Sequence, residues 1–116
     1  MAGWIKLHRE ILENEIWYDI PTYRLFNYLL LKAAHKNGVK KNGIVLKRGQ
    51  WVRSYRKLAQ DLAYRDGRGL SEYSLNTIKR CVHKLVEDGR ITVHDTEYGT
   101  LFTIINYAKY QDSNEV

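Results

Sequence analysis

The side chains best suited to chemistry in this sequence are cations, and they are concentrated in one part of the chain. Residues 20–60 contain ten lysines and arginines and not one aspartate or glutamate. A segment with so much unopposed positive charge attracts the phosphates of a nucleic acid. The cations in this segment that we expect to hold phosphate are Lys40, Lys41, Arg53, Arg56 and Lys57.

A second set of candidate side chains lies on a helix predicted over residues 74–88. Its apolar residues recur at helical spacing and predict a buried face: Leu75, Ile78, Val82, Leu85 and Val86. The opposite side carries hydrogen-bonding and cationic groups, of which asparagine can read adenine and arginine can read guanine in a major groove. The expected DNA contacts here are Tyr73, Ser74, Asn76, Thr77, Arg80 and Lys84, flanked by His83. An ordinary solvated helix has a similar face, so this interpretation depends on the surrounding elements.

Residues that could carry catalysis or bind a metal are poorly placed for either role. The four histidines are far apart in sequence, and Cys81 has no second cysteine, so zinc-site spacing is missing. The segment 67–69 lacks the Gly-Lys-Ser/Thr ending of a nucleotide-binding loop. We therefore predict no enzymatic activity, no cofactor and no metal, and expect Cys81 to pack in or near the core.

Composition places these side chains on one folded domain. The chain has 116 residues, of which 44% are hydrophobic, and a single proline. Its longest apolar run, residues 29–31, is far shorter than the roughly 20 residues of a membrane-spanning helix. The first six residues lack the apolar stretch of a signal peptide. One cysteine and a net charge of +6 predict a cytoplasmic protein with a polyanionic partner and no membrane contact.

In the first half of the chain, apolar spacing and turn residues predict two helices and a strand. Residues 4–17 are mostly of helical pattern, with an extended conformation of the first few residues as the alternative. A second helix starts at 19–22 and runs to about Lys36. The inward residues expected on that second helix are Leu25, Phe26, Leu29, Leu30 and Ala33. Asn42-Gly43 marks a turn, and residues 44–52 predict one strand, or two halves around Arg48-Gly49.

The second half predicts two further helices and a hairpin. Ser54 is expected to cap a helix that reaches Tyr64, and residues 65–69 have the composition of a loop. Ser74 is expected to cap the helix that ends at Asp88-Gly89. Residues 90–97 and 99–105 then predict two strands with their turn near Tyr98-Gly99.

This order predicts an α+β winged helix-turn-helix domain over residues 1–116. It is mostly helical, with a small β-sheet, a C-terminal β-hairpin wing and an N-terminal extension over 1–20. The wing tip carries Asp95 and Glu97, which repel phosphate. We therefore expect the tip to stay off the DNA backbone, while the cations before and within the helix 54–64 fix the domain on DNA.

Four stretches of the chain resemble the replisome-organiser proteins of phages of Gram-positive bacteria. The opening, 3–9, and the ending, Ile105-Asn106-Tyr107-Ala108-Lys109-Tyr110-Gln111, are the more specific, and 48–59 and 74–80 are similar to the family's helix-turn-helix. The family is related to the N-terminal domains of DnaD-type primosome proteins. The resemblance implies a winged helix, binding of origin or single-stranded DNA, self-association, and contacts with helicase-loader or primosome proteins. Family members usually continue into a region that engages the helicase loader, whereas this chain ends at Val116, as a fragment or a short relative.

Two other function classes remain open on the same fold. One is a transcriptional repressor or accessory regulator, which fold alone does not distinguish from a replication factor. The other is a protein-interaction module that self-associates through its N-terminal segment. Its support is a group of apolar and aromatic residues that equally well cover the domain's own core: Trp4, Ile5, Ile16, Trp17 and Tyr18.

Overall fold

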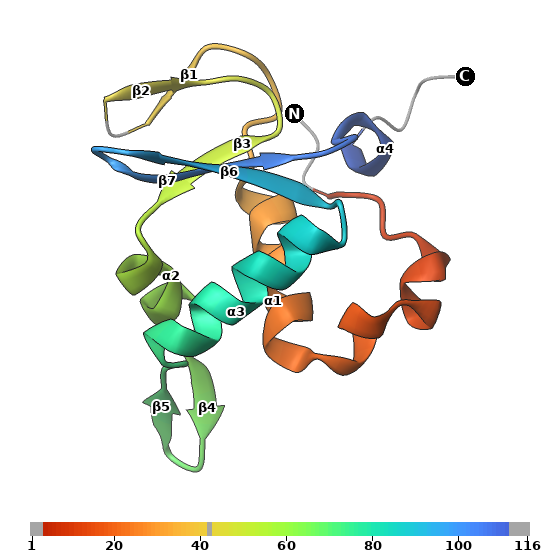
Figure 1. Ribbon diagram of the computed structural model, residues 1–116, viewed down its shortest axis with the longest axis vertical. Helices are drawn as coiled ribbons and strands as arrows, with labels where there is room; N and C mark the ends of the chain where they lie inside the picture. The colour runs from red at the N-terminus through yellow and green to blue at the C-terminus, as the bar shows by residue number, and fades with distance from the viewer. Residues whose placement is uncertain (1–3, 42, 112–116) are drawn as a thin grey trace.

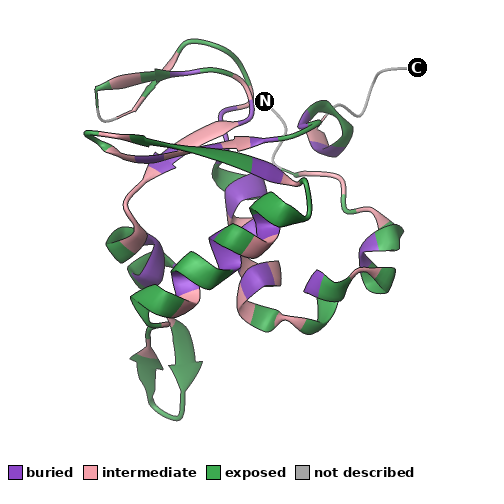
Figure 2. Cartoon of the chain, in the orientation of Figure 1, coloured by how far each residue is buried: buried purple, intermediate pink, exposed green. Residues whose placement is uncertain are grey.

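Helices and small antiparallel sheets alternate along the chain in the computed structural model, which describes residues 4–41 and 43–111 (Figure 1). The predicted α+β class is confirmed. Buried residues, purple in Figure 2, gather where the helices face one another and the sheet. No helix of the described residues has the length and apolar character needed to cross a membrane.

The N-terminal segment forms two short 3₁₀ helices, and the longer helical stretch predicted over 4–17 is wrong. These are η1 (Arg9–Glu13) and η2 (Glu15–Tyr18). Asn14 separates them because its backbone is extended, and its side chain accepts a hydrogen bond from the Ile16 N–H at 2.9 Å. An asparagine that bonds the nearby backbone in this way competes with helix continuation. Ile16 is nevertheless fully buried, so η2 is fastened to the core.

Helix α1 (Ile20–Lys32) starts as predicted and ends earlier than predicted. The Asp19 side chain caps it by accepting from the Thr22 N–H, and all five residues expected to face inward are buried. The helix stops at Lys32 because the backbone of Ala33 leaves the helical conformation, with ψ at 142°. The next residue, Ala34, then exchanges backbone hydrogen bonds with Gly49 and Gln50 at 2.7 and 2.9 Å, which ties the end of α1 to a strand.

Helices α2 (Tyr55–Asp61) and α3 (Leu75–Glu87) carry the N-caps that the sequence predicts. The Ser54 and Ser74 hydroxyls accept from the backbone N–H groups three residues later. The buried residues of α3 are Ile78, Cys81, Val82 and Leu85. Cys81 is in the core as expected, whereas Leu75 and Val86, expected to be inward, are exposed.

The central sheet has three antiparallel strands in the order β3-β7-β6. These are β3 (Gln50–Arg53), β6 (Ile91–Thr96) and β7 (Gly99–Ile104), and the predicted β6–β7 hairpin with its turn at 97–98 is confirmed. The strand predicted over 44–52 is present as two halves, β2 (Ile44–Leu46) and β3. Gly49 lies between them at φ +85, and a Cβ there would lie 3.0 Å from the Cβ of Tyr107.

Two further hairpins correct the sequence prediction. Strand β1 (Val39–Lys41) pairs with β2 around the predicted turn, of which Asn42 lies outside the described residues. Strands β4 (Tyr64–Asp66) and β5 (Gly69–Ser71) form a hairpin across residues 65–69, where the sequence predicts a loop, and Tyr64 belongs to β4 because α2 ends at Asp61 rather than at Tyr64. Both strands of this hairpin are mostly exposed and polar, so no alternation of apolar residues marks them. The hairpin projects past the N-terminal end of α3 (Figure 1).

The two ends of the described chain lie against each other. The short helix α4 (Ala108–Gln111) follows β7, and the Lys6 N–H donates to the Tyr110 carbonyl at 2.6 Å. The Tyr110 ring is buried and makes edge-to-face contacts with His8 and Phe26. The opening and ending motifs thus pack together, apart from Gly3, which lies outside the described residues.

Candidate nucleic-acid interface

The exposed face of α3 is smaller than the sequence predicts. Asn76 is exposed. Tyr73 precedes the helix and is half-buried against the core, with its ring 4.9 Å from that of Tyr64, so it does not belong to this face. The Ser74 hydroxyl accepts from the Thr77 N–H at 3.1 Å and donates to the Thr77 hydroxyl at 3.0 Å, which occupies both side chains in the helix cap.

The two cations expected to contact DNA from α3 are paired with acids of the N-terminal segment. The Arg80 guanidinium donates two hydrogen bonds to the Asp19 carboxylate, at 2.7 and 3.4 Å. The Lys84 ammonium lies 3.5 Å from Glu15 and 3.7 Å from Asp19. An open, solvent-filled hollow lined by these four side chains separates η2 from α3. The face predicted to read DNA is therefore partly neutralised within the same chain.

Asp19 is the residue that sequence reasoning underestimated. Burial disfavours ionisation of its carboxyl group, but the hydrogen bonds from Arg80 and Thr22 outweigh burial and lower its pKa below the ordinary value. Its side chain is 13% exposed, against 53% for Arg80. The sequence places Asp19 only within the predicted helix start, whereas in the structure it caps α1 and also binds Arg80. The signal available in the sequence is the excess of acids over bases in residues 1–19.

Arg53, which the sequence predicts as a phosphate ligand, has an acidic partner in the structure. Its guanidinium donates two hydrogen bonds to Asp61, at 2.8 and 2.9 Å, and thereby ties β3 to α2. The Tyr28 hydroxyl donates to the same carboxylate. Burial, together with this hydrogen bond to Asp61, raises the pKa of Tyr28 to about 12. The triad stabilises the helix that presents the next two cations.

Arg56 and Lys57 are predicted phosphate ligands that remain exposed in the structure. Both are exposed on the first turn of α2. Neither side chain has a hydrogen bond or an ion pair with any residue in the described part of the chain. Because α2 packs against α3, these two charges lie beside the element that carries Asn76. Their predicted placement together on the α2 helix is confirmed.

Lys40 and Lys41 lie on strand β1, in a hairpin whose turn meets the acidic β6–β7 tip. A Cβ added at Gly43, in the β1–β2 turn, would lie 2.9 Å from the ring of Tyr98 at the β6–β7 tip. Lys40 is exposed, whereas the Lys41 ammonium lies 5.0 Å from the centre of the Trp51 ring. The charge of Asp95 and Glu97 is therefore bordered by a basic hairpin.

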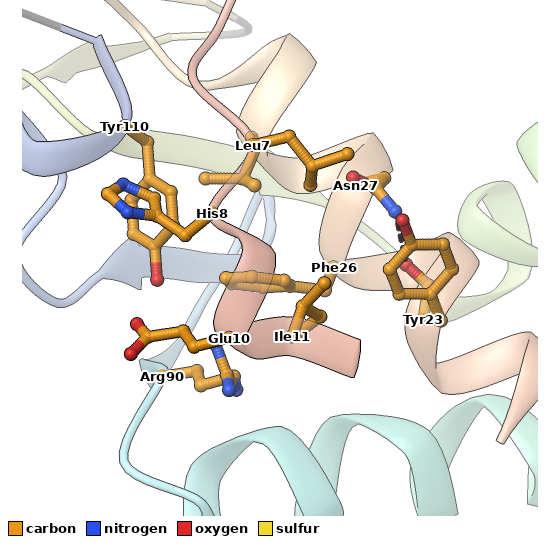
Figure 3. Close-up of a pocket in the computed structure, with 10 residues that line it drawn as sticks. Leu7, His8, Glu10, Ile11, Tyr23, Phe26, Asn27, Arg90 and Tyr110 are labelled. Carbon is orange, nitrogen blue, oxygen red and sulfur yellow. Dashed lines mark hydrogen bonds between the residues drawn. The ribbon is translucent and has the colours of Figure 1, made fainter. Parts of the chain in front are cut away.

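A small cavity near the chain ends is a gap between packed segments, and it is too small for a ligand. Figure 3 shows Leu7, His8 and Ile11 of the N-terminal segment beside Phe26 of α1 and Tyr110 of α4. The space holds a single water molecule at most. The candidate site is therefore the surface formed by α2, α3 and the two hairpin tips, where the predicted DNA contacts that remain exposed are found.

Comparisons with protein-family models, curated proteins and solved structures found no match to this chain. The function proposed next therefore depends on the geometry of this surface and on the sequence motifs. Ion pairs decide which of the predicted cations are available. Arg56, Lys57 and Lys40 are unpaired among the described residues, while Arg53, Arg80 and Lys84 have acidic partners.

Proposed function

We propose that this chain is a winged-helix DNA-binding protein. Helices α2 and α3 would form the helix-turn-helix, with α3 entering the major groove and the β6–β7 hairpin as the wing. The observation that carries the proposal is the pair of exposed cations Arg56 and Lys57 on α2, the helix that packs against α3; neither cation has a partner among the described residues. Cations on the first helix and hydrogen-bonding groups on the second are what such docking requires.

In this docking, α3 supplies base contacts, while α2 and the β1–β2 hairpin supply phosphate contacts. Asn76 is exposed near the N-terminal end of α3, where recognition helices contact bases. Arg56 and Lys57 hold the backbone on one side of the groove. Lys40, on the hairpin that touches the wing, holds it on the other side. The wing's own carboxylates, Asp95 and Glu97, stay off the phosphates.

We further propose a role in replication initiation of a phage or mobile element. The support is the resemblance of residues 3–9 and 105–111 to replisome organisers, together with their packing against each other through His8 and Tyr110. Self-association and contacts with primosome proteins belong to this proposal. A transcriptional regulator would use the same DNA surface, so the choice of DNA separates the two roles.

The test is a salt titration of duplex binding, measured by fluorescence anisotropy. We expect tight binding at low salt that weakens steeply as salt rises, because each neutralised phosphate releases counterions. Exchanging both Arg56 and Lys57 for glutamine should lower the slope of log affinity against log salt by about 2. The matched control removes two charges at the other end of the molecule, with Arg9→Gln and Lys109→Gln.

Three results would contradict the proposal: no duplex binding at low salt, an affinity that does not change with salt concentration, or equal losses of affinity in the test and control variants. Comparing origin duplexes, promoter duplexes and random duplexes then addresses the biological role. Preference for origin DNA supports the replication role, and preference for promoter DNA contradicts it.

A further inference from the structure

The β4–β5 hairpin is an element for which the proposed helix-turn-helix has no use. It is inserted between α2 and α3, and of its six strand residues only Ser71 is even partly buried. Its described contact with the core runs through Tyr64, whose ring lies 4.9 Å from that of Tyr73. The hairpin therefore gains little stability from packing, and its composition needs another explanation.

Strand register divides the hairpin into two faces. Arg65 pairs with Leu70, so these two side chains share one face, while Tyr64, Asp66 and Ser71 share the other. The second face is internally satisfied, since Tyr64 contacts Tyr73 and Ser71 donates a hydrogen bond to Asp66 at 3.4 Å. The first face presents a leucine that is 68% exposed next to an arginine.

The tip adds a second cation. The turn consists of Gly67 and Arg68, with Gly67 at φ +68, a conformation that allows a tight two-residue connection. Neither Arg65 nor Arg68 has a hydrogen-bonding or ionic partner within residues 4–41 and 43–111. The hairpin thus carries two unpaired arginines and one exposed leucine on a narrow ribbon beyond the N-terminal end of α3 (Figure 1).

We propose that the β4–β5 hairpin enters the minor groove of the same DNA duplex, next to the major groove occupied by α3. An arginine attracted by the negative potential of the minor groove, with an apolar side chain that wedges at a base step, is a combination suited to that groove. This inference rests on the proposed function, because it takes the position of α3 on DNA as given.

The reach of the hairpin fits this placement. A three-residue strand with its turn extends roughly 10 Å at about 3.3 Å per residue. The adjacent minor groove lies about half a helical repeat, or roughly 17 Å, along the duplex from the major groove centre. The hairpin starts at the end of α3 rather than at its centre, so the helix covers part of that distance.

A protein partner fits the same hairpin less well. Stable protein interfaces bury about 800 Å² on each side around an apolar centre. Here the apolar centre would be a single leucine, Leu70, which is too small an apolar area for such an interface. A nucleic acid supplies phosphates for Arg65 and Arg68.

The experiment uses the full chain and an exposed leucine elsewhere as control. Leu70→Ser removes the wedge, and Arg65→Gln with Arg68→Gln removes the cations. Leu31→Ser is the matched control, because Leu31 is 65% exposed on α1, away from the hairpin. The readouts are affinity, salt slope and hydroxyl-radical protection of a duplex, together with the temperature midpoint of unfolding.

We expect wild type to protect a minor-groove stretch on one side of the α3 site. Leu70→Ser should lose that protection and bind about tenfold more weakly, and the double arginine variant should lower the salt slope by about 2. Leu31→Ser should match wild type. Should Leu70→Ser fail to fold, the salt slope of the arginine variant decides the matter alone.

The outcomes separate this inference from the proposed function. Suppose that wild type binds the duplex and that the hairpin variants keep the same hydroxyl-radical protection and the same salt slope. This result overturns the minor-groove contact and leaves the proposed function standing. Absence of duplex binding by wild type overturns both. A change of sedimentation mass in Leu70→Ser would show that the hairpin contacts a second copy of the chain, which also overturns the minor-groove contact.

Discussion

Replacing Asp19 with asparagine tests whether the N-terminal segment competes with DNA for α3. The substitution keeps the helix cap, because asparagine caps as well as aspartate. It removes the charge that holds Arg80 at 2.7 Å and Lys84 at 3.7 Å. If α3 lies in the major groove, both cations must leave the carboxylate or share it with phosphate. We therefore expect Asp19→Asn to bind duplex DNA more tightly than wild type.

The size of the effect follows from the exposure of the pair. A solvent-exposed ion pair contributes about 0.2–1 kcal/mol, and a bidentate arginine pair with one buried partner lies near the upper end of that range. The Asp19 side chain is 13% exposed, so about 1 kcal/mol is appropriate, which corresponds to roughly fivefold tighter binding. The same loss should lower the free energy of unfolding of the free protein by about 1 kcal/mol.

The assay is anisotropy with a fixed duplex at low salt, accompanied by urea unfolding of each variant. Glu10→Gln is the charge-matched control, because it also raises the net charge by one but lies beside Lys109, away from α3. The control should bind almost as wild type does. An equal increase of duplex affinity in both variants would mean that net charge alone causes the effect. Unchanged or weaker binding by Asp19→Asn would refute the idea that the N-terminal segment competes with DNA for α3.

Three further predictions concern stability and the wing. The pKa of Asp61 is lowered chiefly by its hydrogen bond from Arg53, so its stabilising contribution is present above the ordinary value of 3.8 and is lost as pH falls through the folded value. Urea unfolding should therefore show a weaker loss of stability in acid for Asp61→Asn than for wild type, and parallel pH profiles would contradict this. Gly99→Ala should lower the unfolding midpoint and the free energy of unfolding by at least about 1 kcal/mol, because Gly99 has φ +126 and an added Cβ would lie 2.9 Å from backbone atoms of Arg53. Asp95→Asn combined with Glu97→Gln should leave duplex affinity unchanged or modestly improved in anisotropy titrations, and abolished binding in a folded variant would show that the wing carboxylates make a required contact.

Local signals in the sequence are sufficient to predict those helices and strands whose ends depend on a single capping or turn residue. Ser54 and Ser74 cap helices as predicted, because an N-cap depends on the backbone three residues away. The β6–β7 hairpin was found from its alternation and turn. The β4–β5 hairpin was missed because its strands are too short and too polar to show either signal.

The sequence predicts which cations belong to the candidate site, but only partly which of these cations lack an acidic partner. The exposure of Arg56 and Lys57 follows from their positions on the helix, which the spacing of the apolar residues predicts. The partners of Arg53 and Arg80 come from other elements, Asp61 eight residues away and Asp19 sixty-one residues away. Whether a cation is free depends on such tertiary contacts, which charge counting does not include.

The contact between Gly43 and Tyr98 has a consequence for motion. A two-stranded ribbon joined to a domain only at its base swings freely, and holding it against a ligand costs conformational entropy. Here the β6–β7 ribbon is joined to β3 along its length and meets the β1–β2 ribbon at its tip, so each restrains the other. Lys40 therefore lies on a ribbon that is already ordered in the free protein. Binding of a polyanion at Lys40 should cost little conformational entropy, so little of the binding free energy is lost in ordering this ribbon.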